Sequence, residues 1–154
     1  MTSKVLVTGG TGMIGNALQG LLGDALYLSS SDCDLKNTAA TNRLFGEARP
    51  EFVIHLAAKV GGVKANTDYI GDFFLDNILI NTNVIEASRR CGIKKVISIL
   101  STCVYPDEVV YPLTEDQVHS GPPHSSNFGY AHAKRMLDVQ SRAYRQQHGC
   151  NFIT

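Results

Sequence analysis

Short apolar runs alternate along the chain with longer stretches in which apolar residues recur at helical spacing. The apolar runs predict strands at 5–7, 25–28, 52–56, 96–100 and 151–154. The helical patterns cover 13–22, a segment around Leu44 and Phe45, 69–90 and 130–147. Gly23 and Gly92 are suited to end two of these helices, because glycine is common just after a helix. Alternation of strand and helix predicts an α/β fold, a parallel sheet with helices on both faces.

Composition supports one globular unit and argues against two kinds of partner. The 154 residues fit one domain, and 44% are apolar while 18% are charged. Fourteen basic and fourteen acidic residues cancel, which leaves no electrostatic basis for binding nucleic acid or an anionic membrane. No apolar run approaches the roughly 20 residues that a membrane helix needs. The first four residues lack the apolar core of a signal peptide, so we expect a cytoplasmic protein.

The four cysteines do not form a metal or disulfide pattern. No CxxC pair occurs, and no cysteine stands at metal-ligand spacing from a histidine. We therefore expect free thiols and no metal site, as is usual for a reducing compartment. They are Cys33, Cys91, Cys103 and Cys150.

A glycine-rich loop follows the first strand and opens the first helix. Gly9, Gly12 and Gly15 lack Cβ atoms, so the turn can be tight and backbone N–H groups can approach a pyrophosphate at a helix N-terminus. Strand, loop and helix in this order predict a Rossmann-like dinucleotide site; the alternative is a tight turn that binds nothing. The expected cofactor-binding residues of the loop are Gly9, Gly10, Thr11, Gly12, Met13, Ile14 and Gly15.

The end of the second strand bears on the choice between NADP and NAD. NAD-selective folds place an acidic residue there, to bind the ribose 2′-hydroxyl. Here serines 29–31 come first, and their hydroxyls do not repel a 2′-phosphate. This favours NADP, although Asp32 would favour NAD if the strand ran further. Asp34 and Leu35 are expected beside the adenine.

Four polar side chains are candidates for catalysis. Tyr130 and Lys134 lie one turn apart on a predicted helix, and an ammonium near a phenol lowers the phenol's pKa. Ser101 follows the fourth strand, at the edge where open α/β sheets bind ligands. If the strand persists, Cys103 faces the same side as Ser101. The alternatives are an exposed helix face for the first pair, a buried serine bonded to backbone, and a cysteine that only packs.

The glycine loop and the Tyr130–Lys134 pair together resemble the extended subgroup of the short-chain dehydrogenase/reductase superfamily. The segment Ser101-Thr102-Cys103-Val104-Tyr105-Pro106 resembles, more closely, the signature of the GDP-L-fucose synthase family. Further stretches that resemble this family are 55–62, 121–124 and 127–135. The family catalyses 3,5-epimerisation and 4-reduction of GDP-4-keto-6-deoxy-D-mannose with NADPH, and its proteins are about twice as long.

The resemblance implies a role for each candidate. The glycine loop would hold the NADPH pyrophosphate, while Ala57 and Ala58 would line the nicotinamide side. Ser101 would hydrogen-bond the C4 oxygen of the sugar, Tyr130 would protonate it, and Lys134 would hold the nicotinamide ribose. Cys103 would remove the protons at C3 and C5.

The resemblance also implies parts that these 154 residues do not contain. The acid partner of Cys103 would be a histidine beyond Thr154, and we expect the five histidines present to be structural or solvated. Residues 1–154 would form an incomplete NAD(P)-binding domain without its substrate domain. The two long helices would form a homodimer interface, unless they are simply buried against the sheet. Other readings are another nucleotide-sugar epimerase or dehydratase of the subgroup, and a dinucleotide-binding fragment without turnover.

Overall fold

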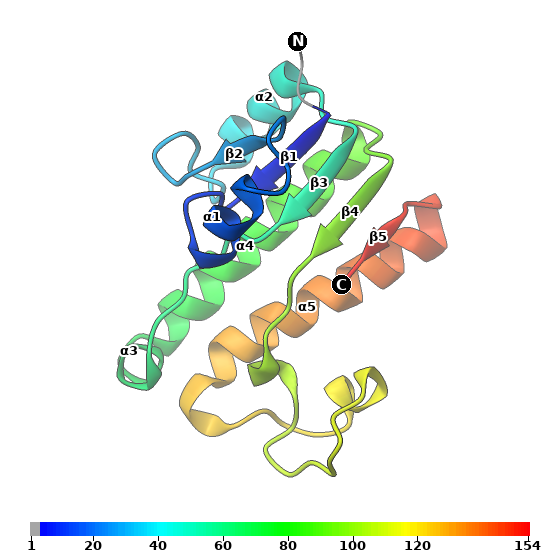
Figure 1. The fold of residues 1–154 in the computed structure, drawn as a ribbon. Helices are drawn as coiled ribbons and strands as arrows, with labels where there is room; N and C mark the ends of the chain where they lie inside the picture. The colour runs from blue at the N-terminus through cyan, green and yellow to red at the C-terminus, as the bar shows by residue number, and fades with distance from the viewer. Residues whose placement is uncertain (1–3) are drawn as a thin grey trace.

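The computed structural model describes residues 4–154 and contains a five-stranded parallel sheet in the order β2-β1-β3-β4-β5 (Figure 1). The expectation about a signal peptide falls partly on residues 1–3, which lie outside the described part. The predicted fold class, a Rossmann-like parallel sheet with helices, is confirmed. The strands are β1 Val5–Thr8, β2 Leu26–Leu28, β3 Phe52–His55, β4 Lys95–Ser98 and β5 Phe152–Ile153.

Helices cover both faces of this sheet unequally. The long helices α4 and α5 pack against each other behind the sheet with α2 next to α4, whereas α1 lies in front (Figure 1). The helices are α1 Met13–Gln19, α2 Thr38–Ala48, α3 Val63–Asp68, α4 Ile70–Arg90 and α5 Phe128–His148. Three short 3₁₀ helices are η1 Thr102–Val104, η2 Glu115–His119 and η3 Ser125–Asn127. None of the helices in residues 4–154 has the length and apolarity that crossing a bilayer requires.

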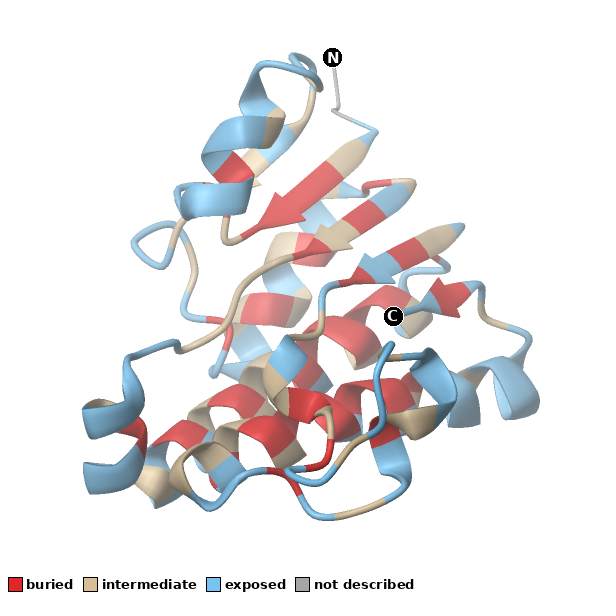
Figure 2. Cartoon of the chain, turned by 60° about the horizontal axis from the view of Figure 1, so that its bottom comes forward, coloured by how far each residue is buried: buried red, intermediate tan, exposed pale blue. Residues whose placement is uncertain are grey.

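The core lies between the sheet and the layer of α2, α4 and α5, where buried residues concentrate (Figure 2). Phe45, Ile85 and Leu137 come from the three helices and are completely buried. Each such side chain contributes about 1.5–3 kcal/mol by leaving water. On the other face, Ile97 and Ile153 are 37% exposed. The apolar periodicity of the long helices therefore reflects, first of all, packing on one face of the sheet.

Several predicted boundaries differ from the structure by one to three residues, and two of these differences are informative. The fourth strand ends at Ser98 rather than Leu100, because its neighbour β3 ends at His55 and the Ile99 carbonyl is taken by a lysine side chain. The first helix ends at Gln19, three residues early, in a turn that leads toward β2. The sequence pattern also missed α3, whose six residues carry no apolar repeat.

The most crowded glycine is Gly15, in the first turn of α1. A Cβ atom there would lie 2.5 Å from the Gly10 carbonyl oxygen, so the glycine lets helix and loop backbones touch. Gly46 lies inside α2 with nothing within 4 Å of its Cβ position. We expect Gly15→Ala to destabilise the fold by about 1–3 kcal/mol through overpacking. We expect Gly46→Ala to stabilise it by about 0.5–1 kcal/mol through the better helix propensity of alanine.

Urea unfolding of both variants beside the wild type measures these effects. Equal stability of the two variants would contradict the crowding argument, since both replace a helical glycine by the same residue.

Candidate active site

The glycine loop is held between the ends of β2 and β3. Gly9 adopts φ +71°, and a Cβ there would come within 2.8 Å of the Ala57 nitrogen. Gly10 donates its N–H to the Leu28 carbonyl at 2.6 Å, and a Cβ there would meet the Tyr27 side chain at 2.6 Å. Gly10 therefore packs against β2 and does not border the cleft, unlike its expected role. These contacts require glycine at both positions and fix the loop at the carboxyl edge of the sheet.

A cleft of about 560 Å³ opens along this edge, within the usual size range of small-molecule sites. It joins the glycine loop to the segments that follow β2 and β3. The N-terminus of α1 at the cleft has no side-chain cap, so its first N–H groups point to a place suited to a phosphate. The expected cofactor-binding residues that line the cleft are Gly9, Thr11, Gly12, Met13, Ile14, Gly15, Asp34, Leu35, Ala57 and Ala58.

The segment after β2 presents neutral hydroxyls to the cleft. Ser29 and Ser30 line it, whereas Asp32 does not. The Asp32 carboxylate accepts hydrogen bonds from the Ser29 N–H at 2.8 Å and from the Ser29 hydroxyl at 2.6 Å. These bonds lower the pKa of Asp32 and hold its carboxylate against Ser29 of the same loop. The residue that would have favoured NAD is therefore directed away from the cleft.

A buried hydrogen-bond chain links the cofactor side of the sheet to helix α5. The Ala57 N–H donates to the Thr8 hydroxyl at 3.3 Å, and this hydroxyl lies 2.7 Å from His55 Nδ1. His55 Nε2 lies 3.1 Å from Asn81 Oδ1, and the Asn81 amide donates to the Ala133 carbonyl at 3.1 Å. Every group is satisfied when the imidazole is neutral and carries its proton on Nε2. Burial lowers the pKa of His55 to about 3, so this form persists at neutral pH.

Three of the four candidate catalytic side chains converge beyond the end of β4. Ser101 is extended and its hydroxyl accepts the Cys103 N–H at 3.4 Å, so Cys103 lies in the η1 turn and not on a strand. The prediction that a continued strand aligns these two residues is wrong, because the chain turns at Thr102. The turn nevertheless brings them together. The Ser101 hydroxyl is near enough to the Tyr130 phenol to lower its pKa, and Cys103 is near enough for its charge to raise it.

The Tyr130–Lys134 pair behaves differently from the sequence-based expectation. Burial raises the pKa of the Tyr130 phenol, and a negative charge on Cys103 raises it further, against the opposing effect of Ser101. The predicted lowering of this pKa is therefore wrong, and Lys134 Nζ donates to the Ile99 carbonyl at 2.9 Å. Burial lowers the pKa of Lys134 to about 8. Tyr130 is therefore a protonated phenol near neutral pH, suited to give a proton.

Arg135 fixes the turn that carries Cys103. Its guanidinium is buried and donates to the Val104 carbonyl and to the Gly121 carbonyl, each at 2.7 Å. One side chain of α5 thus anchors η1 and the loop before α5 to the tyrosine helix. The basic residue at this place in the sequence gave no signal of this role, because arginine on a helix is usually solvated.

Ser101 does not line the first cleft but borders a second cavity, of about 580 Å³, between β5 and α5. Its wall includes Asp138, a buried carboxylate that accepts from His119 at 2.8 Å, Arg142 at 3.0 Å and Thr154 at 3.1 Å. These partners lower the pKa of Asp138 against the effect of its burial. His119 is thus tied to a structural carboxylate, in agreement with a structural role.

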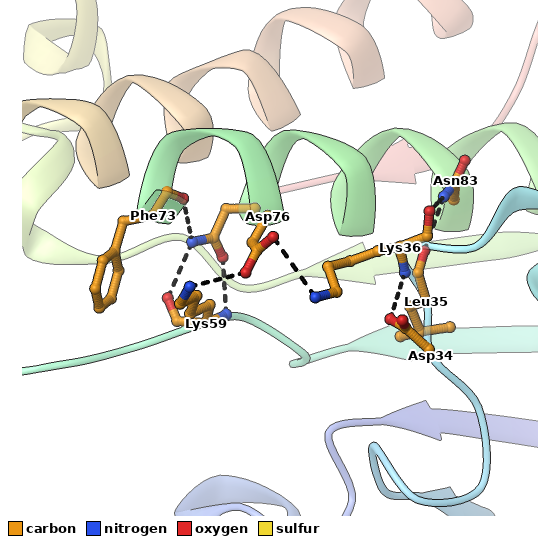
Figure 3. Close-up of polar contacts among 8 residues, drawn as sticks. Asp34, Leu35, Lys36, Lys59, Phe73, Asp76 and Asn83 are labelled. Atoms are coloured by element: carbon orange, nitrogen blue, oxygen red, sulfur yellow. Dashed lines mark hydrogen bonds and ion pairs between the residues drawn. The ribbon is translucent and has the colours of Figure 1, made fainter. Parts of the chain in front are cut away.

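Sequence reasoning missed the polar wall of the cleft on the side of α4. Lys36, Lys59 and Asp76 line the cleft, and their contacts are drawn in Figure 3. Nothing in the sequence marks Asp76, an acid in the middle of a helix. Only the place of Lys59, directly after Ala57 and Ala58, could have suggested its position.

Three asparagines of α4 hold segments other than the loop that carries Ser101. Asn77 bonds the backbone of Lys59, Asn81 bonds His55 and Ala133, and Asn83 bonds the backbone of residues 35–36.

The model of the NAD dependent epimerase/dehydratase family matches residues 5–154. The chain belongs to this family. Among its relatives, GDP-L-fucose synthase of Dictyostelium discoideum is 46% identical over 162 residues, which cover 99% of this chain and 51% of that protein. The probable GDP-L-fucose synthase of Drosophila melanogaster is 48% identical over 153 residues, which cover 95% of this chain and 48% of that protein.

Solved structures of similar proteins share the fold. The GDP-L-fucose synthetase of Naegleria fowleri bound to NADP is 41% identical with a TM-score of 0.89, and the match covers 99% of this chain and 49% of that one. The GDP-mannoheptose C4 reductase of Campylobacter jejuni with NADP bound is 30% identical with a TM-score of 0.93, and the match covers 99% of this chain and 50% of that one. The chain thus spans about half the length of the relatives it matches.

Metal ligation has no support in the described residues. Within 4–154, no three or more His, Cys, Asp or Glu side chains are grouped so that they could hold an ion.

The neutral state of His55 predicts a specific pH dependence. An unfolded histidine titrates near pH 6.5, whereas the folded-state pKa is about 3, so the unfolded state binds more protons between these values. The free energy of unfolding therefore falls as the pH drops from 6.5 toward 3. Between pH 6.5 and pH 5 we expect a loss of about 2 kcal/mol from this group.

The measurement is urea unfolding of the wild type and His55→Gln at several pH values. The variant is less stable at pH 7 but loses less stability on acidification. The exposed His148 supplies the control variant His148→Gln, which should keep the wild-type slope. A wild-type slope in His55→Gln would contradict the neutral assignment.

Proposed function

We propose that this chain is the cofactor-binding part of an NADPH-dependent enzyme that epimerises GDP-4-keto-6-deoxy-D-mannose at C3 and C5 and reduces it at C4, which gives GDP-L-fucose. The single observation that carries the proposal is the convergence of Ser101, Cys103 and Tyr130 beyond the end of β4, in a chain whose glycine loop lines a cleft of the size that a dinucleotide needs. A thiol has no task in a simple 4-epimerase, but a 3,5-epimerase needs a base. Relatives named GDP-L-fucose synthase, at 46–48% identity, support the same assignment.

NADPH is the proposed reductant. The cleft has the size and the glycine-lined phosphate end that a dinucleotide needs, and Ser29 and Ser30 accept a 2′-phosphate without repulsion. NADP is bound in the structure of the Naegleria fowleri relative. When bound, the cofactor supplies the hydride that reduces C4.

The protein's part in the reduction is to handle the C4 oxygen. Hydride addition to the ketone leaves a negative charge on this oxygen, which Ser101 stabilises by a hydrogen bond. Tyr130 donates its proton to the oxygen, a direction that its raised pKa favours. Lys134, adjacent to Ala133 at the end of the buried chain, supplies positive charge near the nicotinamide ribose.

Epimerisation precedes reduction, because it needs the ketone. The protons at C3 and C5 are acidic since the enolate that forms places its charge on the C4 oxygen, where Ser101 and Tyr130 act again. Cys103 is the base that removes each proton, and an acid on the opposite face of the sugar returns one. This acid and the groups that recognise the GDP belong to the substrate-binding part of the whole enzyme.

A homodimer is part of the proposal. Helices α4 and α5 pack together, and both leave large apolar side chains exposed on the outer side. Such side chains on neighbouring helices suit burial against a second copy. They are Phe74, Leu75, Met136 and Val139, at 41–54% exposure.

Cofactor binding is tested first, on the 154-residue chain. Titration with NADPH, followed by nicotinamide fluorescence, should give saturable binding that Gly12→Val abolishes or weakens at least tenfold, because the valine side chain enters the phosphate end of the cleft. Gly23→Val, at a glycine with open space around it, serves as the control. Absence of wild-type binding would contradict the assignment of this chain as a cofactor domain.

The role of Cys103 is tested in the whole enzyme. We expect Cys103→Ser to lower the rate of proton exchange at C3 and C5 by about 10²–10⁴-fold, the usual range for loss of a general base. Deuterium incorporation from D₂O, measured by NMR with NADP⁺ in place of NADPH, reports epimerisation without reduction. Cys91→Ser, at an exposed cysteine, should exchange at the wild-type rate. Full exchange by Cys103→Ser would assign the base elsewhere.

A further inference from the structure

The charged side chains on the wall of the cofactor cleft come from four residues only, within the described part of the chain. They are two acids and two lysines, Asp34, Lys36, Lys59 and Asp76, so the cleft has a formal charge of zero. A dinucleotide with a 2′-phosphate brings about three to four negative charges at neutral pH. The cleft contains no arginine. The cationic side chains available to these phosphates in the cleft are therefore the two lysines.

Helix α4 fixes the backbone of both lysines. The Asn77 amide accepts the Lys59 N–H at 3.0 Å and donates to the Lys59 carbonyl at 2.9 Å. Asn83 donates to the carbonyls of Leu35 and Lys36 at 2.8 and 3.0 Å. Both asparagines are buried. These buried amides hold two loop segments to one helix. They therefore fix the backbone position from which each lysine side chain extends (Figure 3).

The two ammonium groups converge on one carboxylate of the same helix. Lys59 Nζ lies 2.9 Å from Asp76 Oδ2, and Lys36 Nζ lies 3.6 Å from Asp76 Oδ1 (Figure 3). Lys59 Nζ also lies 5.3 Å from the centre of the Phe73 ring. Both lysine side chains are about two-fifths exposed, and ion pairs of this kind contribute about 0–1 kcal/mol to stability. The fold therefore does not depend on these pairs, and the ammonium groups can exchange partners.

The lysines belong to different segments of the cleft wall, those that follow β2 and β3. Lys36 follows Asp34 and Leu35, beside which the adenine is expected, and Lys59 follows Ala57 and Ala58 on the nicotinamide side. Both nevertheless reach the same carboxylate. Asp76 thus brings together positive charge from the two segments that hold the two halves of a dinucleotide.

We propose that Lys36 and Lys59 are the cationic partners of the cofactor's phosphate groups, and that Asp76 is an internal counter-ion that holds both lysines in the cleft and competes with the phosphates for them. This inference rests on the proposed function, since it assumes a phosphate-bearing dinucleotide in the cleft. A carboxylate on the wall of an anion site weakens binding by repulsion. Its presence there is understandable if it keeps two flexible lysine side chains in place in the empty cleft.

The test compares charge variants by their dissociation constants for NADPH and NADH, measured by nicotinamide fluorescence at about 20 mM and 500 mM salt. The variants are Lys36→Met, Lys59→Met and Asp76→Asn. Lys94→Met is the matched control, because Lys94 pairs with Glu51 next to the amino end of β4, away from the cleft. Thermal unfolding of each variant reports any loss of structure separately.

At low salt we expect each cleft-lysine variant to weaken NADPH binding about 3- to 10-fold, and less than about twofold at high salt, where charges are screened. We expect Asp76→Asn to tighten NADPH binding about 2- to 5-fold at low salt, because it removes a competing charge. Lys94→Met should change neither. An equal loss for NADPH and NADH assigns the lysines to the pyrophosphate, whereas a loss for NADPH alone assigns them to the 2′-phosphate.

Three outcomes would overturn the inference. Unchanged affinity in both cleft-lysine variants would remove the phosphate role. A loss that persists at high salt, or weaker binding by Asp76→Asn, would make the three residues a structural support of the cleft wall. Wild-type binding without any of the expected changes refutes this inference alone, whereas absence of wild-type binding refutes the proposed cofactor function as well.

Discussion

The structure depends on one line of buried hydrogen bonds that crosses the carboxyl edge of the sheet. It runs from Thr8 on β1 through His55 on β3 and Asn81 on α4 to the Ala133 carbonyl on α5. Each member has a donor for every acceptor only while His55 is neutral, and a buried group left unpaired costs about 1–3 kcal/mol. This line of hydrogen bonds therefore fixes the distance between the cofactor loops and helix α5, which carries Tyr130.

Helix α4 organises the site, although it contributes no candidate catalytic residue. Asn77, Asn81 and Asn83 hold, in turn, the segment after β3, the helix α5 and the segment after β2. Asp76, on the same helix, forms ion pairs with both lysines of the cleft, Lys36 and Lys59. An apolar helix face would have stabilised the fold by burial alone. The buried amides instead give position, because an amide accepts only a partner with a matching donor or acceptor.

Much of the fold follows from local pattern, whereas the contacts of the site do not. The strand–glycine–helix order and the alternation of elements are properties of neighbouring residues. They predicted the sheet and the glycine loop, whose expected residues all line the cleft except Gly10. The end of β4 depends on where β3 stops and on Lys134, which is distant in sequence. Helical spacing predicted that Tyr130 and Lys134 lie on one face of the helix. It carries no information about the Ile99 carbonyl, which accepts the hydrogen bond of the Lys134 ammonium.

The bond from Lys134 to Ile99 connects the length of a strand to the chemistry beyond it. The Lys134 ammonium bonds the Ile99 carbonyl directly after the end of β4, and the chain turns at Thr102 instead of continuing straight. A continued strand would carry Cys103 further along the sheet edge, whereas the turn folds it back next to Ser101 and within reach of the Tyr130 phenol. Burial lowers the pKa of Lys134 and raises the pKa of Tyr130. The phenol therefore keeps its proton until a negative charge forms on a nearby oxygen. The end of the strand, the turn and the protonated phenol thus lie together around the buried Lys134 side chain.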